Sequence, residues 1–286
     1  MSEHRRNLLE VVAEELRLRN YSPKTIKAYK STIRALAKHF APRHPRELSE
    51  EDIREYLLYL LQKKRYAAST VNQVINALRF LYVDLYGKPF VLGEIPRPKK
   101  SRNLPKVLSE TEVRAILDST SNLKHKALLM LVYSAGLRVG EVVRIKLEDI
   151  DSTRMLIHIR KAKGLKDRYV QLSETVLSTL REYWRHARPR EWLFPGQGDQ
   201  GFLSERTAEE VFKQATTRAG IRKPVSIHSL RHSYATHLLE AGVDIRYIQE
   251  ILGHSNLKTT EIYTHVSKKQ IAKVVNPLDR MFSQTK

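Results

Sequence analysis

The stretch from residue 226 to residue 266 concentrates side chains that could act on a phosphate group. His228 and Arg231 are three residues apart, so on a helix they would share one face. Another histidine, His254, and a tyrosine, Tyr263, follow within the same compact unit. Arginine offers phosphate oxygens a planar, permanently charged fork. Tyrosine can be a covalent nucleophile when a neighbour takes its proton, so these residue types suit attack on a phosphate.

Two other interpretations fit this stretch. His228 and His232 have the i, i+4 spacing of two metal ligands on one helix, but no glutamate follows the first histidine and cysteine is absent. We therefore expect no zinc site here. Residues 243–264 also look like a helix-turn-helix with Gly253 at its turn, which would indicate a DNA-binding protein without catalysis. On local pattern alone, that alternative is as good as the catalytic one.

The elements that must position these side chains are expected to be short helices and one hairpin. The stretch from 226 to 266 predicts three helices, the second ending at Gly253 and the third carrying Tyr263 near its end. Upstream, Arg138 is expected to begin a further helix, with Glu141 one turn later. Residues 161–168, KAKGLKDR, predict a basic hairpin turn. The hairpin carries three lysines: Lys161, Lys163 and Lys166.

The whole chain is strongly basic. It has 286 residues, with 51 Lys and Arg against 31 Asp and Glu, for a formal net charge of +20. The basic residues are spread along the chain and not confined to a tail, which favours a polyanionic partner, most simply nucleic acid. The alternative is an ordinary basic protein with a solvated surface. The length is sufficient for two domains, each with its own core.

Composition also excludes several classes of protein. Cysteine is absent, so disulfides, thiolate catalysis and cysteine-based zinc sites are excluded. We find no signal-like apolar N-terminus and no apolar run long enough to span a bilayer. The expected location is the cytoplasm, with no membrane partner.

Residues 1–92 predict a bundle of helices. Ser22 and Pro23 form a strong start signal, with Ser as N-cap and Pro at the first helical position. Ser49 is expected to cap a third helix, and a fourth is expected from about Ser69 to Tyr86. Basic residues lie between the apolar stripes and either contact phosphates or form a solvated face: Lys24, Lys27, Lys30, Arg34, Lys63, Lys64, Arg65 and Arg79.

A break in periodicity divides the chain. Residues 93–106, GEIPRPKKSRNLPK, contain three prolines and five basic residues and predict a stiff charged linker. Residues 107–286 then predict helices with a small antiparallel sheet, whose strands are 156–159 and 169–172. The expected fold is mainly α: an N-terminal helical bundle followed by a mixed α+β domain.

Five motifs together resemble the tyrosine site-specific recombinases, the lambda-integrase-like family. They are AGLRVGE at 135–141, AKGLKDR at 162–168, HSLR at 228–231, LGH at 252–254 and TTEIYTH at 259–265. Each motif alone is weak, whereas all five in this order are highly specific. The first 92 residues are similar to the family's SAM-like core-binding domain, so the resemblance covers nearly the whole chain. The layout looks most like the Xer-type recombinases.

The resemblance implies a metal-free and cofactor-free reaction that stores bond energy in a phosphotyrosine ester. Tyr263 would attack the scissile phosphate, releasing a 5′-hydroxyl and leaving a 3′-phosphotyrosyl bond. Lys163 is the general acid by resemblance, and Lys161 and Lys166 are competitors on sequence grounds. The other implied roles are transition-state binding by Arg138 and Arg231, proton acceptance by His228, hydrogen bonding by His254 and orientation of Arg138 or a histidine by Glu141. Tyr234 and Tyr247 are rival tyrosines, but both occupy apolar-periodic positions and are expected to pack.

The implied partner is a double-stranded DNA recombination site, synapsed by four protomers, with an accessory protein left open. The tail at 266–286 would dock on a neighbouring protomer, or else pack on its own domain. The expected role is chromosome-dimer resolution and hence chromosome partition. The alternatives are a mobile-element integrase with the same chemistry, a type IB topoisomerase, an RNA-binding protein and the non-catalytic helix-turn-helix regulator. The regulator would leave Arg138, Lys163 and His228 without a shared purpose.

Overall fold

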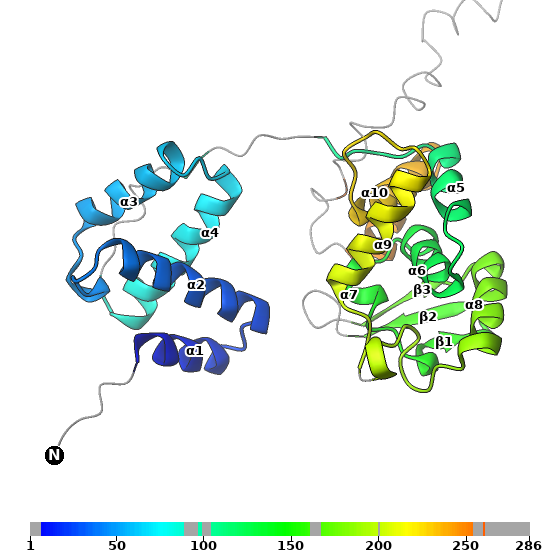
Figure 1. Ribbon diagram of the computed structural model, residues 1–286, viewed down its shortest axis with the longest axis horizontal. Coiled ribbons are helices and arrows are strands. Elements are labelled where there is room, and N and C mark those ends of the chain that lie inside the picture. Colours follow the sequence, from blue (N-terminus) through cyan, green and yellow to red (C-terminus); the bar gives the residue numbers. More distant parts are fainter. Residues whose placement is uncertain are drawn as a thin grey trace, which may run out of the picture. The chain divides into compact units, whose positions relative to one another are not determined.

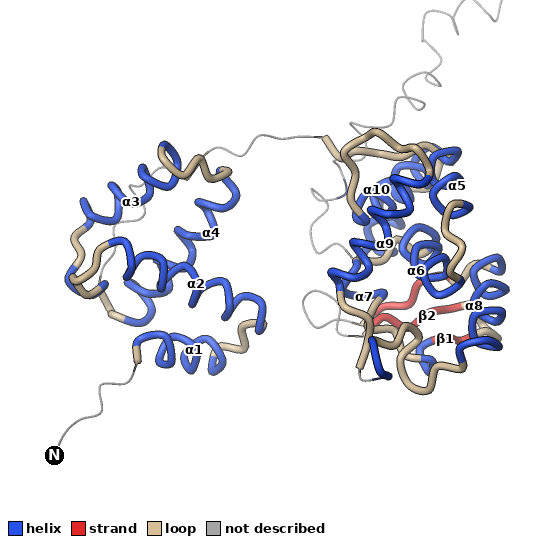
Figure 2. Tube along the Cα trace, in the orientation of Figure 1, coloured by secondary structure: helices blue, strands red, loops and turns tan. Residues whose placement is uncertain are grey.

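We obtained a computed structural model of the chain, and it describes residues 7–88, 97–98, 104–160, 167–199, 201–253 and 260. The chain divides into two compact units, Met1–Arg102 and Asn103–Lys286, here called unit 1 and unit 2. Helices dominate both units, and strands occur only in unit 2 among the described residues (Figure 2). The predicted mainly helical fold is therefore confirmed.

Unit 1 is built from amphipathic helices that enclose one apolar core (Figure 1). Ser22 begins its second helix as predicted: the Ser22 hydroxyl accepts a hydrogen bond from the Thr25 backbone N–H at 3.2 Å, and Pro23 occupies the first turn. Ser49 caps the third helix in the same way. The described helices of unit 1 are α1 (Leu8–Leu18), α2 (Pro23–His39), the 3₁₀ turn η1 (Pro45–Glu47), α3 (Glu50–Gln62) and α4 (Ala68–Arg79).

The fourth helix of unit 1 differs from its prediction. The sequence predicts one continuous helix to Tyr86, but α4 ends at Arg79 and continues as a π-helical segment, η2 (Phe80–Leu85). This segment buries Phe80 and Tyr82 in the core, and the Tyr82 hydroxyl donates a hydrogen bond to the Pro45 carbonyl at 2.6 Å. Apolar periodicity cannot distinguish these two helical windings over six residues.

Unit 2 is organised around one helix that is apolar on all sides. Helix α6 (Leu123–Ser134) buries six consecutive residues, Ala127 to Val132, and packs against helices on several sides. The other described helices of unit 2 are α5 (Glu110–Asp118), α7 (Val139–Val142), η3 (Leu147–Asp149), α8 (Glu174–Ala187), η4 (Gln197–Asp199), α9 (Glu205–Arg218), α10 (Ile227–Glu240) and α11 (Ile245–Leu252).

A small antiparallel sheet lies at one side of unit 2. In the described part of this unit the strand order is β1-β2-β3, with β1 at Ile150–Asp151, β2 at Leu156–Ile159 and β3 at Arg168–Gln171. The predicted antiparallel pairing of the two strands is confirmed, with Ile157 opposite Val170 and Ile159 opposite Arg168, although β3 begins one residue before the predicted 169–172 and residues 161–166 of the predicted turn lie outside the described residues. Strand β1 was not predicted, because two residues are too short to show a period of two.

No helix among the described residues is long and apolar enough to cross a membrane. Three predicted site residues and the whole C-terminal tail from 261 onwards lie outside the described residues. The predicted third helix of the 226–266 stretch and the predicted docking role of 266–286 thus lie outside the described residues, apart from the buried Thr260.

Candidate active site

A tight turn after α6 places Arg138. Gly136 has φ +59°, in the left-handed region that favours glycine. A Cβ there would lie 2.7 Å from a ring carbon of Tyr234 and 2.8 Å from a methyl carbon of Leu252. Only glycine allows the turn to approach α10 and α11 this closely. Two residues later, Arg138 is the N-cap residue of the single-turn helix α7.

Glu141, on α7, folds back onto Arg138. Its carboxylate accepts hydrogen bonds from the Arg138 backbone N–H at 2.9 Å and from Arg138 Nη1 at 2.7 Å. The Glu141 side chain is only 9% exposed, whereas Arg138 is 25% exposed. Glu141 therefore fixes the backbone and one guanidinium nitrogen of Arg138, while the rest of that guanidinium still reaches solvent.

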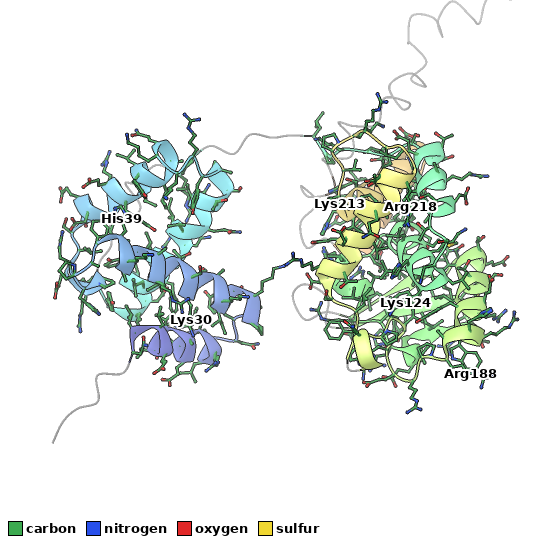
Figure 3. All side chains as sticks on the ribbon, viewed as in Figure 1. Lys30, His39, Lys124, Arg188, Lys213 and Arg218 are labelled. Carbon is green, nitrogen blue, oxygen red and sulfur yellow. The ribbon has the colours of Figure 1, made fainter. Side chains whose placement is uncertain are left out.

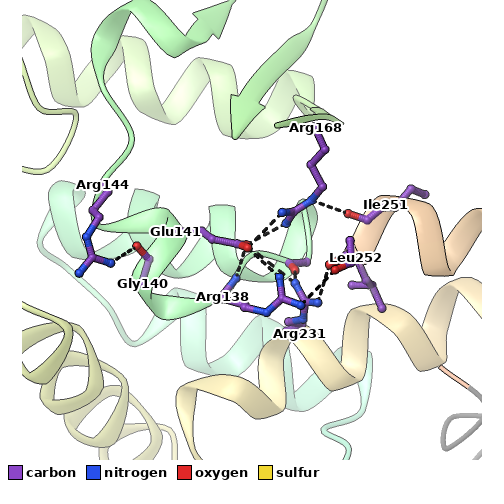
Figure 4. A network of polar contacts seen from close by, with 10 residues as sticks. Arg138, Gly140, Glu141, Arg144, Arg168, Arg231, Ile251 and Leu252 are labelled. Carbon is purple, nitrogen blue, oxygen red and sulfur yellow. Dashed lines mark hydrogen bonds and ion pairs between the residues drawn. The ribbon is translucent and has the colours of Figure 1, made fainter. Parts of the chain in front are cut away.

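Arg168, the first residue of β3, binds the same carboxylate from the opposite side (Figure 4). Its Nη1 and Nη2 donate to the two oxygens of Glu141 at 3.0 and 2.8 Å, a bidentate ion pair. Its Nε donates to the carbonyl of Ile251 at 3.1 Å. Strand β3 and helix α11 are thereby joined to α7.

Arg231 enters from α10 and is 4% exposed. Its Nη1 donates to the Gly136 carbonyl, and its Nη2 donates to the Leu252 carbonyl at 2.7 Å. Its Nη1 also lies 4.0 Å from Glu141 Oε2. The structure thus brings together Arg138 and Glu141 of the 135–141 motif and Arg231 of the 228–231 motif.

We call Arg138, Glu141, Arg168 and Arg231 the Glu141 cluster. Among the described side chains of this cluster, three guanidinium groups share one carboxylate, which leaves a net charge of +2. Burial alone would raise the pKa of Glu141, but the ion pair with Arg168 and the bonds from Arg138 outweigh it and lower the pKa to about 2. Glu141 is therefore ionised at neutral pH. The remaining positive charge suits an anion that gains charge as it reacts.

His228 lies in the first turn of α10, one turn before Arg231, and is exposed. The protein around its ring removes part of the solvent from the otherwise exposed His228, and this desolvation together with the nearby Arg231 charge lowers the pKa of His228. The imidazole is therefore neutral at physiological pH and able to accept a proton. Burial and the neighbouring His228 lower the pKa of His232 to about 4. No group of three metal-binding side chains occurs among the described residues.

Three predicted site residues, Lys163, His254 and Tyr263, lie outside the described residues, as do the competing lysines Lys161 and Lys166. Two neighbours of these segments are described. Gly253, immediately before His254, ends α11 with φ +61°, and its carbonyl accepts a hydrogen bond from Arg138 Nη2 at 3.3 Å. Arg168 comes shortly after residues 161–166, which carry the three lysines, with only Asp167 between them. Both neighbours belong to, or contact, the Glu141 cluster.

Of the rival tyrosines, Tyr234 packs against Gly136 and edge-to-face against Tyr133, and burial raises its pKa. The expectation that Tyr247 packs is wrong, because its side chain is 66% exposed on α11. The apolar stripe of α11 is carried by Ile248 and Leu252 instead. Tyr247 lies one residue before Ile248, which on a helix turns it away from that stripe.

Arg168 is the member of the cluster that sequence reasoning missed. It stands in the AKGLKDR motif, but nothing local distinguishes it from the other basic residues of the hairpin. Its partner Glu141 is 27 residues away. In the predicted hairpin Arg168 belongs to the turn before the strand, whereas the structure makes it the first residue of β3.

Comparisons with known families agree with the two-unit organisation of the chain. Residues 106–270 match the phage integrase family, and residues 8–90 match the N-terminal SAM-like domain of phage integrases. The first match includes every predicted site residue.

Individual relatives cover nearly the whole chain. The Sinorhizobium fredii protein named integrase/recombinase y4qK is 40% identical to this chain over 273 residues, which cover 95% of this chain and 88% of the relative. The tyrosine recombinase XerA of Pyrococcus horikoshii is 36% identical over 274 residues, covering 94% and 92%. The crystal structure of the XerH recombinase in a post-cleavage complex with its difH substrate superimposes with a TM-score of 0.72 at 23% identity, covering 93% and 82%. That last likeness concerns the fold alone.

Proposed function

The chain belongs to the phage integrase family, the tyrosine recombinases that cleave and rejoin DNA, and we propose that it is an Xer-like member that resolves chromosome dimers. The observation that carries the recombinase chemistry is the Glu141 cluster, where two predicted phosphate-binding arginines, Arg138 and Arg231, meet on one carboxylate. The 36% identity to XerA supports the Xer-like role. We propose residues 1–92 as the core-binding domain, 93–106 as a linker and 107–286 as the catalytic domain.

In the proposed first step, the Tyr263 oxygen attacks the scissile phosphorus while His228 accepts the phenolic proton. The bond between phosphorus and the 5′-oxygen breaks, and Lys163 gives that oxygen a proton. The products are a 3′-phosphotyrosyl ester and a free 5′-hydroxyl. The 5′-hydroxyl of a partner strand then attacks the ester and regenerates Tyr263, so no external energy source is required.

The two arginines are assigned to the non-bridging phosphate oxygens. A phosphodiester carries one negative charge, and its pentavalent transition state concentrates additional charge on those oxygens. A cluster with a net charge of +2 stabilises this state more than the ground state. Carbonyl groups hold Arg231, and Glu141 holds Arg138, so neither guanidinium must reorganise during the reaction.

Double-stranded DNA is the proposed partner. Relatives of similar fold are recorded on DNA, including XerH with its difH substrate and a lambda integrase tetramer on a Holliday junction. The formal charge of +20 supports such a polyanionic partner. We accordingly propose that four protomers synapse two sites, with the 266–286 tail contacting a neighbouring protomer.

The non-catalytic regulator remains the alternative from another class. Helices α10 and α11 pack through Leu239, Ile248 and Leu252, as a helix-turn-helix would. A regulator, however, would have no use for a positive cluster beneath the Gly136 turn. Family membership and the cluster therefore both favour the recombinase.

The test is covalent trapping. Genomic fragments bound by the Tyr263→Phe variant are sequenced to find the site, and a duplex of that site is nicked close to the scissile phosphate so that the short fragment is lost after cleavage. We expect wild-type protein, but not Tyr263→Phe, to form an adduct that survives denaturation and chelator. Tight binding without an adduct would favour the regulator.

The location of the selected site separates the two recombinase roles. An Xer-like role predicts one chromosomal locus with two inverted half-sites, and loss of the gene should leave chromosome dimers unresolved. Sites at the ends of a mobile element would instead show that the protein is an element integrase, the alternative with the same chemistry.

A further inference from the structure

Arg168 directs each of its three guanidinium nitrogens at an acceptor in the protein. All three guanidinium nitrogens donate within the Glu141 cluster or to α11: Nη1 and Nη2 to Glu141, and Nε to the Ile251 carbonyl. The side chain is 11% exposed, less than half the exposure of Arg138. Arg168 therefore acts on its protein neighbours.

The first neighbour is Glu141. Each oxygen of its carboxylate receives one bond from Arg168 and one from Arg138: Oε1 from Nη1 of both residues, and Oε2 from Arg168 Nη2 and the Arg138 backbone N–H. A buried carboxylate is costly unless it is paired, and the bidentate fork also fixes its orientation. Arg168 thus determines where Glu141 can hold Arg138.

The second neighbour is the C-terminal end of α11. The Ile251 carbonyl accepts from Arg168, the next carbonyl, of Leu252, accepts from Arg231, and that of Gly253 accepts from Arg138. A Cβ on Gly253 would lie 3.1 Å from Arg168 Cδ, so the helix end rests on the arginine stem. Arg168 therefore anchors the helix end whose next two carbonyls bind Arg231 and Arg138.

We propose that Arg168 is a positioning residue of the recombination reaction: it fixes Glu141 and the end of α11, which in turn aim Arg138 and Arg231 at the scissile phosphate. The inference rests on the proposed function. It assigns to a residue of the lysine hairpin motif a task that is distinct from proton donation.

The test is a double-mutant cycle on Arg168 and Glu141. Cleavage of the nicked site is followed under single-turnover conditions at saturating protein, with DNA affinity measured separately. We expect Arg168→Gln to slow cleavage about 10- to 100-fold, the usual effect of removing a group that orients an active-site residue. DNA affinity should change by less than about threefold, because in this proposal Arg168 orients protein groups and does not itself contact the DNA backbone.

The cycle distinguishes positioning from other roles. Because Arg168 acts partly through Glu141, the Arg168→Gln/Glu141→Gln double variant should lose less cleavage rate than the product of the two single effects, and any loss beyond the slower single variant reports the contact with α11. Multiplicative effects of the two changes, or a loss of DNA affinity that matches the loss of cleavage, would overturn the proposal. Arg168→Lys keeps the charge without the fork and should recover only part of the rate.

Arg160→Gln is the matched control. Arg160 stands on the other side of the 161–166 segment and binds Asp149 at 2.5 Å and Glu148 at 3.0 Å, away from the Glu141 cluster. We expect the Arg160→Gln variant to cleave at the wild-type rate. If it is impaired as much as Arg168→Gln, loosening either end of the hairpin slows the reaction, which would contradict our proposal.

If Arg168→Gln does not fold, as judged by thermal unfolding, Arg168→Lys replaces it in the cycle. Absence of the wild-type adduct would instead reject the proposed function itself.

Discussion

Gly136 determines how closely the chain can bring Arg138 and Arg231 together. Its carbonyl accepts a bond from Arg231, and Arg138 follows two residues later. The residue needs both a positive φ and the space that a Cβ would fill, against Tyr234 at 2.7 Å and Leu252 at 2.8 Å. Backbone conformation and packing therefore impose the same residue at this position.

We predict that Gly136→Ala lowers the free energy of unfolding by about 3 kcal/mol, combining roughly 1 kcal/mol for the left-handed backbone with overpacking of 1–3 kcal/mol. Denaturant unfolding measures this. The matched control is Gly220→Ala, because Gly220 has φ +69° with nothing within 4 Å of its Cβ. That variant should lose only about 1 kcal/mol. Equal losses would show that the contacts with Tyr234 and Leu252 cost nothing.

The histidines on α10 make stability depend on pH. The pKa of His232 is lowered to about 4 from an ordinary value of 6.5. The unfolded chain therefore binds more protons than the folded protein between these values, and stability falls as pH falls from 6.5 towards 4. This difference in pKa lowers the free energy of unfolding by roughly 3 kcal/mol once the pH is below about 4. Glu141, with a pKa of about 2, contributes stability that is lost only at lower pH, from about 5 downwards.

Replacing His232 with glutamine should remove most of that dependence. We expect the unfolding free energy of His232→Gln to vary less than that of the wild type between pH 6.5 and 4, since the side chain no longer titrates. Chemical denaturation at several pH values provides the measurement. A variant with the full wild-type slope would show that another group carries the effect.

At the scale of elements, the sequence predicts what is encoded locally. Two predicted start signals, Ser22 with Pro23 and the N-cap Ser49, mark helix starts that the structure has. The β2–β3 hairpin follows from two short apolar strands around a basic turn. The predicted helix start at Arg138 is also present, since α7 begins at Val139 with Arg138 as its N-cap.

Pairings between distant elements could not be predicted. The spacing of Arg168 and Glu141 in the sequence carries no record of their contact, because folding brings β3 beside α7. The π-helical winding of η2 depends on how Phe80 and Tyr82 fit the core of unit 1. Motif resemblance supplied Arg138, Glu141 and Arg231, but only the three-dimensional arrangement shows that all three converge on one carboxylate.

Ser233 joins the first segment of unit 2 to the helix that carries Arg231. Its hydroxyl accepts a hydrogen bond from the Leu108 backbone N–H at 2.9 Å and donates one to the Ser229 carbonyl at 2.7 Å. Ser233 and Leu108 are both completely buried. We predict that Ser233→Ala costs about 1–3 kcal/mol of unfolding free energy, because it leaves a buried N–H without its acceptor.

Thermal or denaturant unfolding tests this prediction, with Ser178→Ala as its control. Ser178 is exposed on α8, so its replacement should change stability by less than about 0.5 kcal/mol. If Ser233→Ala is as stable as the control, water or a local shift satisfies the Leu108 N–H, and the segment is attached to α10 by apolar packing alone.

At the scale of the whole molecule, the charge of +20 must be distributed so that part of it faces DNA. In unit 1, Lys27 and Lys30 line a groove of about 520 Å³ beside Tyr21, and Arg34 is exposed on the same helix, α2. Lys30 is labelled in Figure 3. None of the three basic residues forms an ion pair with another described side chain, so their charges are available to phosphates.

We predict that the triple change of Lys27, Lys30 and Arg34 to glutamine weakens DNA binding and flattens its salt dependence. Each lost phosphate contact lowers the slope of log affinity against log salt by about 0.9, or roughly 2.7 for all three. Binding is measured from low to moderate salt on the selected site. The adduct formed per bound complex should be unchanged, because these residues belong to a different unit from the Glu141 cluster.

The control removes the same charge from another surface. Arg181 and Arg185 are exposed on α8, and Arg188 is the exposed C-cap residue of that helix, which lies at the edge of unit 2 opposite α7 (Figure 1). Changing these three to glutamine lowers the net charge equally, so any effect of overall charge alone would appear in both triple variants. We expect the α8 variant to keep the wild-type slope, because α8 packs on α6 and carries no member of the Glu141 cluster. Equal slopes in the two triple variants would mean that overall charge, and not a basic face on α2, attracts DNA.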